Sequence, residues 1–406
     1  MTARKRASAT VTTTSAAADS RPAQADHKFP ESTSSDQSIA PPKWGVIVKL
    51  SLLLSIPYFY LLFYHCKIEQ ELKRSILINA GLSLAGFFVT LKIIPVASRY
   101  VLRRSLFGYD INKKGTPQGT VKVSESLGIV VGIIFLVLAV VFQYFNFTAD
   151  SNWLVEYNAA LASICFMILL GFVDEVLDVP WRVELLLPSF ATLPLLMAYA
   201  GHTTIIIPKP LIPYVGLEVL DLRWIYKLYK ALLAVFCMNS INIHAGLNGL
   251  EVGQTVVNAF AIMVHNIMQI GASSNPEYQH ARAFSIYLVQ PLLATSLALL
   301  SYNWYPSSVF VGDINTVFAG MAMAVLFGFV KCPRHRLPRF NPETGLLSGT
   351  PDCALVNLRI FGPKSEKSLC VHLLIVQSVG SCFCFLLRYL RMLLLFPPEV
   401  LTCWLV

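Results

Sequence analysis

The chain has 406 residues, of which 55% are hydrophobic and only 14% charged, and its mean hydropathy is +0.59. These values exclude an ordinary soluble globular protein and favour a chain that crosses a membrane several times. The formal net charge of +9 does not indicate a nucleic-acid-binding protein, because the basic residues cluster beside apolar runs, where they suit anionic head groups and phosphates.

Residues 1–43 are rich in Ala, Ser, Thr, Pro and charge, and this composition predicts a disordered cytosolic tail. Behind it, in the range 44–406, we count about ten apolar runs that could cross a hydrocarbon core of roughly 30 Å. The runs lie near 46–65, 76–97, 126–146, 155–173, 185–200, 229–247, 253–271, 284–302, 308–330 and 368–396. The first begins too far from Met1 for a cleaved signal peptide, so we expect it to remain as an extra N-terminal anchor. The sequence therefore predicts an all-α polytopic membrane protein.

The loop after the second run indicates the orientation of the chain. Its basic residues are Arg99, Arg103, Arg104, Lys113, Lys114 and Lys122. Basic residues in short loops are retained on the cytosolic side, so this loop and the N-terminus are predicted to be cytosolic. Counting spans onward places the loops at Asp174, at 242–248 and at 303–306 on the same face.

Polar clusters lie at the boundaries of these runs. Asp174, Glu175 and Asp178 directly follow the apolar run 157–172, and acids at a membrane edge suggest a functional site. Three more clusters are NSINIHAGLN at 239–248, FVGD at 310–313 and CPRHRLPR at 332–339. Carboxylates, amides and arginines together suit Mg²⁺ and a phosphate, so the predicted chemistry is phosphoryl transfer to an ionised lipid phosphate.

Three long motifs carry a resemblance: NSINIHAGLNGLEVGQ at 239–254, NWYPSSVFVGD at 303–313 and CPRHRLPR at 332–339. They resemble the eukaryotic, and above all the plant, dolichyl-phosphate N-acetylglucosaminephosphotransferases, which are polyprenyl-phosphate sugar-1-phosphate transferases. The resemblance implies a multi-pass enzyme of the endoplasmic reticulum, with cytosolic site loops and a homodimer as one form. Such an enzyme moves N-acetylglucosamine (GlcNAc) 1-phosphate from UDP-GlcNAc to dolichyl phosphate, releases UMP, starts N-glycan assembly and is inhibited by tunicamycin.

The resemblance also implies roles for single residues. Asn242 and Asp313 would bind Mg²⁺, with Asp174 and Glu175 as catalytic acids near the metal and the acceptor phosphate. The residues implied at the nucleotide are Glu125, Gly246, Asn248 and Phe310, and those implied at the sugar and pyrophosphate are Arg334, His335 and Arg336. Simpler interpretations remain open at this point, since Asp174 could end a helix in solvent and the asparagines could be cap or turn residues.

The sequence departs from the family pattern within its chemistry. Glu175 stands where the relatives have aspartate, and Glu184 stands where they have a lysine that neutralises phosphate charge. Asp313 is followed by Ile314 and Asn315 instead of threonine and its usual neighbour. The first two changes alter reach or charge at positions that the resemblance assigns to catalysis, and the third is a smaller change.

The resemblance implies a further apolar span, about thirty residues and long enough to cross a bilayer, between Asp313 and Arg334, and this chain lacks it. Each crossing moves the chain to the other side of the membrane. If 308–330 crosses, residues 331–367 lie in the lumen, away from Asp313.

Either 308–330 enters and returns without crossing, with Gly312, Gly320 and Gly328 as possible breaks, or the C-terminal part is misplaced and the site is incomplete. Re-entrant backbone needs cover from protein or a water-filled cavity, and no proline marks a turn, so we favour the second alternative and expect a probe near Asn341 to report the lumen. A luminal loop with so many basic residues would contradict the positive-inside preference.

Three hypotheses follow from the sequence. The chain is an active transferase, or an impaired or inactive splice variant or divergent copy of one. A lipid or nucleotide-sugar transporter is the third, and it is disfavoured because the sequence lacks paired, interrupted helices in two matching halves.

Overall fold

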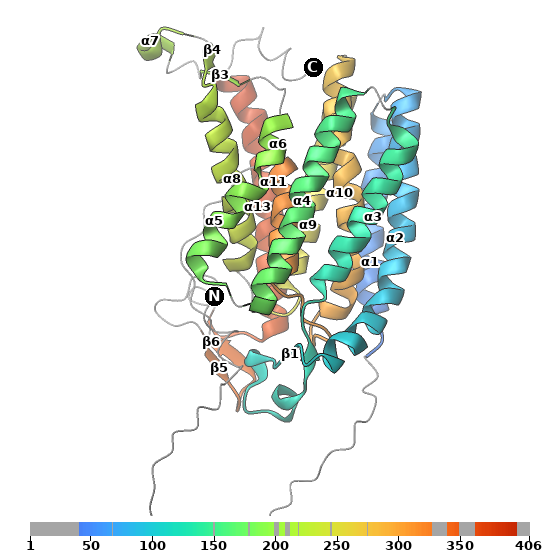
Figure 1. Ribbon diagram of the computed structural model, residues 1–406, viewed down its shortest axis with the longest axis vertical. Coiled ribbons are helices and arrows are strands. Elements are labelled where there is room, and N and C mark those ends of the chain that lie inside the picture. The colour runs from blue at the N-terminus through green and yellow to red at the C-terminus, as the bar shows by residue number, and fades with distance from the viewer. Residues whose placement is uncertain are drawn as a thin grey trace, which may run out of the picture.

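The computed structural model describes residues 40–66, 68–148, 151–177, 179–198, 203–207, 212–217, 219–243, 246–273, 275–326, 339–348 and 362–395. In these ranges the fold is a bundle of helices with three two-stranded ribbons at its ends (Figure 1). The predicted tail falls on the range 1–39, outside the described residues, apart from its last four positions.

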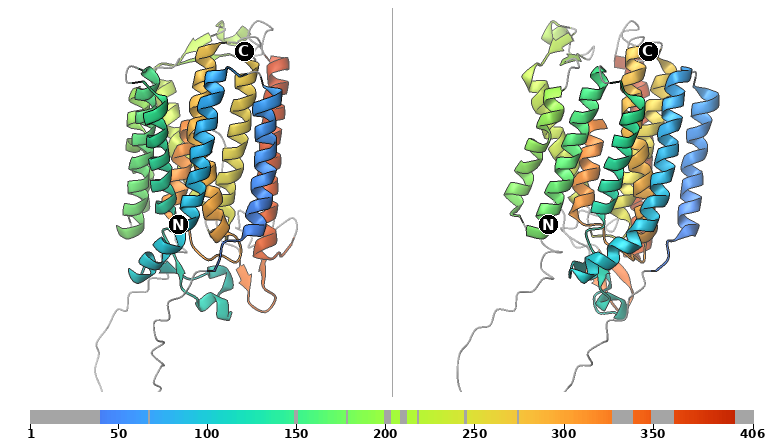
Figure 2. Two further views of the ribbon diagram at one scale, coloured as in Figure 1. Left: turned by 90° about the vertical axis from the view of Figure 1, so that its right-hand side faces the viewer. Right: turned by 45° about the vertical axis from the view of Figure 1, so that its right-hand side comes forward.

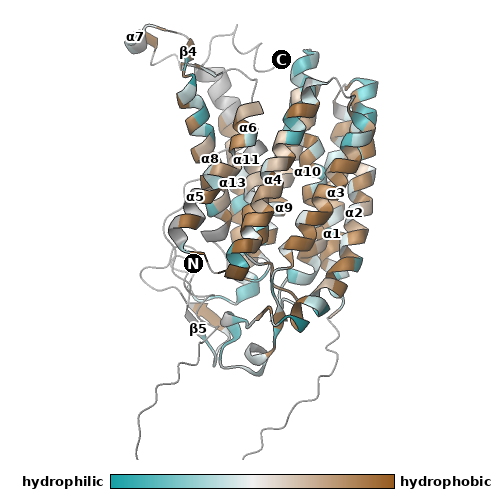
Figure 3. Ribbon diagram, in the orientation of Figure 1, coloured by the Kyte–Doolittle hydropathy of each residue, from teal (hydrophilic) through white to brown (hydrophobic). Residues whose placement is uncertain are grey.

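Seven helices in the described ranges are long and apolar enough to cross a membrane, so the chain is a polytopic membrane protein. They are α1 (Trp44–Tyr60, extended by the π-helix Leu61–His65), α2 (Gln70–Arg103), α3 (Gly128–Asn146), α4 (Asn152–Leu177), α9 (Leu250–Ala272), α10 (Pro276–Asn303) and α13 (Glu366–Leu395). Their apolar residues form a broad band, and hydrophilic residues gather toward the two ends (Figure 3).

The remaining three predicted runs form other helices of the same bundle (Figure 2). The run at 185–200 becomes α5 (Trp181–Ala191) and α6 (Leu193–Ala198), which are separated at Thr192. Pro188 lies inside α5 and Pro194 follows the break, and proline removes a helical hydrogen bond. The other two are α8 (Trp224–Ile243) and α11 (Asp313–Leu326). The expectation of about ten spans thus exceeds the seven that the described residues support by length and composition.

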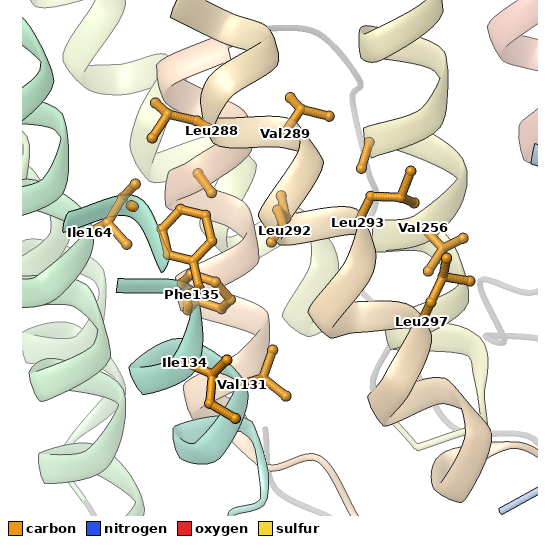
Figure 4. Packing of buried hydrophobic residues seen from close by; sticks show 14 of the residues in the cluster. Val131, Ile134, Phe135, Ile164, Val256, Leu288, Val289, Leu292, Leu293 and Leu297 are labelled. Carbon is orange, nitrogen blue, oxygen red and sulfur yellow. The ribbon is translucent and has the colours of Figure 1, made fainter. Parts of the chain in front are cut away.

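The helix α10 is the centre of the bundle. In the most apolar stretch of α10, 83% of the residues are buried inside the bundle. The corresponding share is 17% in α1 and 11% in α13, so these two helices are peripheral. Figure 4 shows Leu292 of α10 beside Phe135 of α3, and Leu293 and Leu297 beside Val256 of α9. All of these side chains belong to one buried cluster, which fixes the helix ends relative to one another.

A buried polar contact ties α1 and α2 to α10. The amide of Asn79 donates to Gln290 Oε1 at 2.6 Å and to the Tyr287 carbonyl at 3.0 Å. Gln290 in turn donates through Nε2 to the hydroxyl of Tyr58. Polar side chains between membrane helices are stabilising when they satisfy one another in this way. The extra N-terminal helix is therefore specifically attached to the bundle.

Two ribbons lie at one end of the bundle, which we call the β1–β2 end (Figure 1). There β1 (Phe107–Gly108) pairs with β2 (Val123–Ser124), Phe107 facing Ser124, and β5 (Arg339–Asn341) pairs with β6 (Leu346–Ser348), Arg339 facing Ser348. The short helices Ile111–Lys113 and Pro117–Thr120 connect β1 to β2. At the opposite end β3 (Thr204–Ile206) pairs with β4 (Val219–Asp221), beside α7 (Ile212–Val215). All three pairings are antiparallel.

The position of the β5–β6 hairpin contradicts the predicted luminal placement. A Cβ added to Gly115 would lie 3.3 Å from Pro342, so the hairpin and the β1–β2 connection lie at the same end. Asp313 at the start of α11 and Arg339 at the start of β5 both lie at this end, so the chain makes no net crossing between these two residues. Parity counting assumed a full crossing, and the chain is back at the β1–β2 end by Arg339.

This topology predicts the outcome of cysteine labelling. In a cysteine-depleted chain in sealed microsomes, Asn341→Cys and Thr120→Cys are expected to react with a membrane-impermeant maleimide from the same side. Glu277→Cys, at the start of α10 and the opposite end, should react only from the other side. If positions 341 and 277 react from the same side of the membrane, the luminal placement of the hairpin is correct.

Candidate active site

The segment that precedes α11, residues 309–311, is bonded to the β1–β2 ribbon and to the start of α3. The Phe310 N–H donates to the Ser124 carbonyl at 2.7 Å, and Ser124 forms a parallel bridge with Val309. The Gly128 N–H donates to the Val311 carbonyl at 2.9 Å. These bonds hold the first turns of α3 and α11 next to each other, and thus position Asp313, the first residue of α11.

Glu125 and Phe310, two of the residues predicted at the nucleotide, lie together. A Cβ added to Gly108 would lie 3.2 Å from Glu125 Oε2 and 3.2 Å from Cδ2 of the Phe310 ring. The absence of a side chain at Gly108 therefore allows the acid and the aromatic ring to approach the same point of β1. Phe310 is 4% exposed, so its ring is largely covered in this arrangement.

Glu175 lies directly against the residue before Asp313. A Cβ added to Gly312 would lie 2.2 Å from Glu175 Oε1, and the φ of +74° at Gly312 also favours glycine. One turn earlier in α4, a Cβ at Gly171 would lie 2.8 Å from the Ile314 Cα. The two glycines let α4 and α11 meet nearly backbone to backbone, which brings the predicted acid of α4 to the start of α11.

Asp174 is not a helix end in solvent. Its side chain is only 7% exposed, and it lines a narrow apolar cleft between α4, α5 and α11 with Leu187 and Val317. A carboxylate in apolar surroundings is retained where it is paired or serves chemistry. The simpler interpretation of Asp174 from the sequence is therefore wrong.

The turn at 246–249 carries Asn248 and is held at both ends. The Gly246 N–H donates to Glu251 Oε1 at 3.0 Å, and the Gly249 N–H donates to Asn303 Oδ1 at 3.1 Å. Both glycines have positive φ, +119° and +81°. The Asn248 side chain does not cap its own turn, since its Nδ2 donates to Asp110 Oδ2 at 2.8 Å. The amide is therefore engaged by a distant segment of the chain.

A buried polar network surrounds this turn, and sequence reasoning missed most of it. Glu366 Oε1 accepts from the Asn248 N–H at 2.9 Å and from Asn112 Nδ2 at 3.1 Å. Asn112 Nδ2 also donates to the Gly246 carbonyl at 2.7 Å. The only signal in the sequence was an acid and an amide, Asp110 and Asn112, within an otherwise basic loop. Nothing in the sequence linked Glu366 to this loop.

The β5–β6 hairpin covers the same turn from outside. Leu347 is fully buried in a small cluster with Leu247 and Leu250 on one side and Leu369 and Cys370 of α13 on the other. Two backbone bonds between Leu347 and Lys364, at 2.7 and 3.0 Å, fasten the hairpin to the start of α13. The C-terminal part of the chain is therefore part of the site's architecture.

Other predicted site residues are placed only by their backbone. A Cβ at Gly320 of α11 would lie 2.4 Å from the Met238 Cα of α8, and the two helices run in opposite directions. Asn242, one turn beyond Met238, thus lies toward Asp313. Glu184 lies in the first turns of α5. Arg334, His335 and Arg336 fall outside the described residues.

The donors at the start of α11 fit a magnesium site. No group of three His, Cys, Asp or Glu side chains that could enclose a metal occurs among the described residues. Magnesium, however, is usually held by one or two carboxylates together with water and substrate phosphates. Asn315 is fully buried, and neither polar atom of its amide has a hydrogen-bond partner within the described ranges. Residues two apart on a helix do not face each other, so this amide is not placed beside Asp313. The carboxylates near the start of α11 are those of Asp313 and of Glu175, which lies against Gly312.

Comparison with known proteins gives a consistent result. The model of glycosyl transferase family 4 matches residues 157–330. The UDP-N-acetylglucosamine–dolichyl-phosphate N-acetylglucosaminephosphotransferase of Dictyostelium discoideum is 44% identical over 365 residues, covering 77% of this chain and 89% of that protein. The proteins of the same name from Schizosaccharomyces pombe and Saccharomyces cerevisiae are 33% and 31% identical, covering 68% and 79% of this chain and 73% and 84% of their own lengths.

A helical membrane bundle whose polar loops gather acids, amides and glycine turns at one end is suited to a glycosyl-phosphate transferase. The identity and coverage above establish the relationship. The chain belongs to glycosyl transferase family 4, in the family of UDP-N-acetylglucosamine–dolichyl-phosphate N-acetylglucosaminephosphotransferases.

The packing of Leu347 predicts a local effect of mutation. Leu347→Ala removes a fully buried side chain, which typically costs about 2–5 kcal/mol, so the hairpin should detach from the turn. We expect faster tryptic cleavage within 339–348 in detergent. Leu346→Ala, at a less buried position in the same strand, is the control and should be cleaved at the wild-type rate. Equal cleavage of both variants would contradict the anchoring role of Leu347.

Proposed function

We propose that the chain transfers GlcNAc-1-phosphate from UDP-GlcNAc to dolichyl phosphate, giving GlcNAc-diphosphodolichol and UMP. The reaction would be the first step of N-glycan precursor assembly, in the endoplasmic reticulum membrane with the β1–β2 end in the cytosol. The observation that carries this proposal is the contact of Glu175 with Gly312, which brings this acid of α4 next to the residue before Asp313. Family membership supplies the two substrates, since they are those in the relatives' names.

The reaction needs little covalent help from the protein. An oxygen of the acceptor phosphate attacks the phosphorus that carries GlcNAc, and a new P–O bond forms. The bond from that phosphorus to the bridging oxygen breaks, and UMP leaves with the electron pair. Because the attacking phosphate is already ionised, no general base is required, and positioning and charge stabilisation supply the rate.

The acids and Asp313 determine where the reacting phosphates can lie. Asp174 and Glu175 are negative, as are both substrates, so a cation must be present for the phosphates to approach them. Asp313 and Asn242 would hold Mg²⁺, with Asp174 near the acceptor phosphate. When bound, this ion would neutralise charge on the pyrophosphate and on the leaving UMP.

The nucleotide would occupy the space beside the segment 309–311. Phe310, next to Glu125, is proposed to stack on the base, and the turn with Gly246 and Asn248 is proposed to face the base edge. Arg334, His335 and Arg336 are proposed to hold the sugar and pyrophosphate, because guanidinium groups bind phosphate oxygens in pairs. The hairpin that follows these residues lies at the β1–β2 end, so their assignment agrees with the path of the chain on either side.

A second candidate is an impaired or inactive copy of the transferase. Glu184 puts a negative charge where a lysine is expected. The alignment with the Dictyostelium protein runs over 365 positions but includes 77% of the 406 residues, so several dozen aligned positions have no residue in this chain. The position of the hairpin removes the topological argument for this candidate, and the missing positions remain in its favour.

A transfer assay separates the two candidates. Microsomes that express only this chain are given radiolabelled UDP-GlcNAc and dolichyl phosphate, with and without magnesium and tunicamycin. The active transferase yields a lipid product that requires magnesium and disappears with tunicamycin. Membrane-inserted protein without any product would favour the inactive copy.

The contact at Gly312 predicts a selective loss of activity. Gly312→Ala would push the Glu175 carboxylate away from Asp313, and a displacement of roughly 1 Å can lower kcat on the order of a hundredfold. Gly345→Ala is the matched control, since Gly345 has a similar φ of +66° and nothing within 4 Å of an added Cβ. Both alanines bear a left-handed strain of about 1 kcal/mol, so the two thermal midpoints should be similar. Equal activity of the two variants would show that this contact is not important for catalysis.

A further inference from the structure

Two buried carboxylates hold the same asparagine from different directions, one through its side chain and one through its backbone. Resting on the function proposed above, we propose that Asp110 and Glu366 are positioning residues. They orient Asn248 so that its amide oxygen accepts a hydrogen bond from the nucleotide base, which selects uracil over cytosine. Asn248 is the residue that would contact the base, and the two acids would act through it.

Asp110 determines which way the amide faces. Its carboxylate is 6% exposed, pairs with the Lys113 ammonium at 3.0 Å and accepts from Asn248 Nδ2 at 2.8 Å. The ammonium also lies 5.2 Å from the centre of the Tyr305 ring, which holds it in place. An ionised carboxylate can only accept hydrogen bonds. The NH₂ group of Asn248 must therefore face Asp110, and its oxygen must face the other way.

Glu366 determines where the turn lies. One carboxylate oxygen accepts both the Asn248 N–H and the Asn112 amide, and Asn112 donates in addition to the Gly246 carbonyl. The acid and Asn112 thus fix the turn on both sides of Leu247. Rotation of the turn would break these buried bonds together, and a buried donor without a partner is costly.

The network lies next to the proposed base pocket. Asp110 is two residues from Gly108, against which Glu125 and Phe310 are packed. Two residues of chain reach at most about 7 Å, so Asp110, which holds the amide, lies close to the strand residue against which Glu125 and Phe310 are packed. A base stacked on the ring would present its edge to the turn.

The chemistry of the bases explains the selectivity. Uracil presents N3–H between two carbonyl oxygens, and this donor suits an amide oxygen. Cytosine has an unprotonated N3, so its lone pair would face the oxygen of Asn248 and both acceptors would lack a donor. A site built around a substrate N–H rejects analogues that lack it far more strongly than shape alone would allow.

The test compares UMP with CMP as inhibitors of transfer by the full-length chain, and as ligands in thermal-shift measurements without transfer. In Asp110→Asn the new amide can donate or accept, so the Asn248 amide is free to flip. The ratio of CMP to UMP inhibition constants should fall about tenfold or more, as expected when one hydrogen bond loses its specificity. This ratio does not depend on how much of the variant is folded.

A second substitution should restore the preference. In Asp110→Asn combined with Asn248→Asp, the amide at position 110 donates to the carboxylate at position 248, which still offers an acceptor to the base. Glu343→Gln, an exposed acid of the hairpin, is the control and should leave the ratio unchanged. A wild-type ratio in Asp110→Asn, or no recovery in the double variant, would overturn the proposed role of Asp110.

Glu366 is tested through KM. Glu366→Ala should raise KM for UDP-GlcNAc about tenfold at nearly constant kcat, because the turn loses its acceptor before the substrate binds. Glu366→Gln retains an accepting oxygen and should stay close to wild type. An unchanged KM in Glu366→Ala would refute the positioning role. If the wild-type chain neither transfers sugar phosphate nor binds UMP, the proposed function itself fails, whereas UMP preference that survives Asp110→Asn refutes only this inference.

Discussion

Backbone contact around α11 is the constraint on which the site depends. A Cβ added to Gly128, Gly171 or Gly320 would lie within 2.4–2.8 Å of backbone atoms in a neighbouring helix. Three helices, α3, α4 and α8, can therefore approach α11 only because glycine stands at one side of each contact. Membrane helices gain little from the hydrophobic effect against lipid, so close packing at small residues does much of the work. This packing sets the start of α11, and with it Asp313.

Hydrogen bonds at the β1–β2 end add to the glycine packing inside the bundle, because they tie helices to the loops of the site. Lys43, just before α1, donates to the carbonyls of Trp304 and Pro306, and so ties the N-terminal helix to the loop that leads to the segment 309–311. Partial burial and the nearby Lys113 ammonium lower the pKa of Lys43 to about 8. Glu366 ties α13 to the turn at 246–249 in the same way. Segments from both ends of the chain thus support one site.

The topology shows where counting along the sequence fails. The run at 308–330 is apolar enough to suggest a crossing, and parity then placed everything after it on the far side. The hairpin nevertheless lies at the end where α11 began, since Leu347 is buried against Leu247. Parity depends on every earlier span, so one segment that does not cross reverses the predicted side of all that follows.

The sequence by itself determined the class of protein and much of the site. Apolar runs of sufficient length predicted membrane helices, and the motifs around Asp174, Asn248 and Asp313 predicted polar loops that the structure does bring to one end. Only the tertiary structure decided which side the hairpin occupies, and that Asp110 and Glu366 share Asn248. Those contacts join residues 118 to 138 positions apart. Span length and motif are local properties of a chain, whereas a buried hydrogen bond exists only after distant segments have packed against each other.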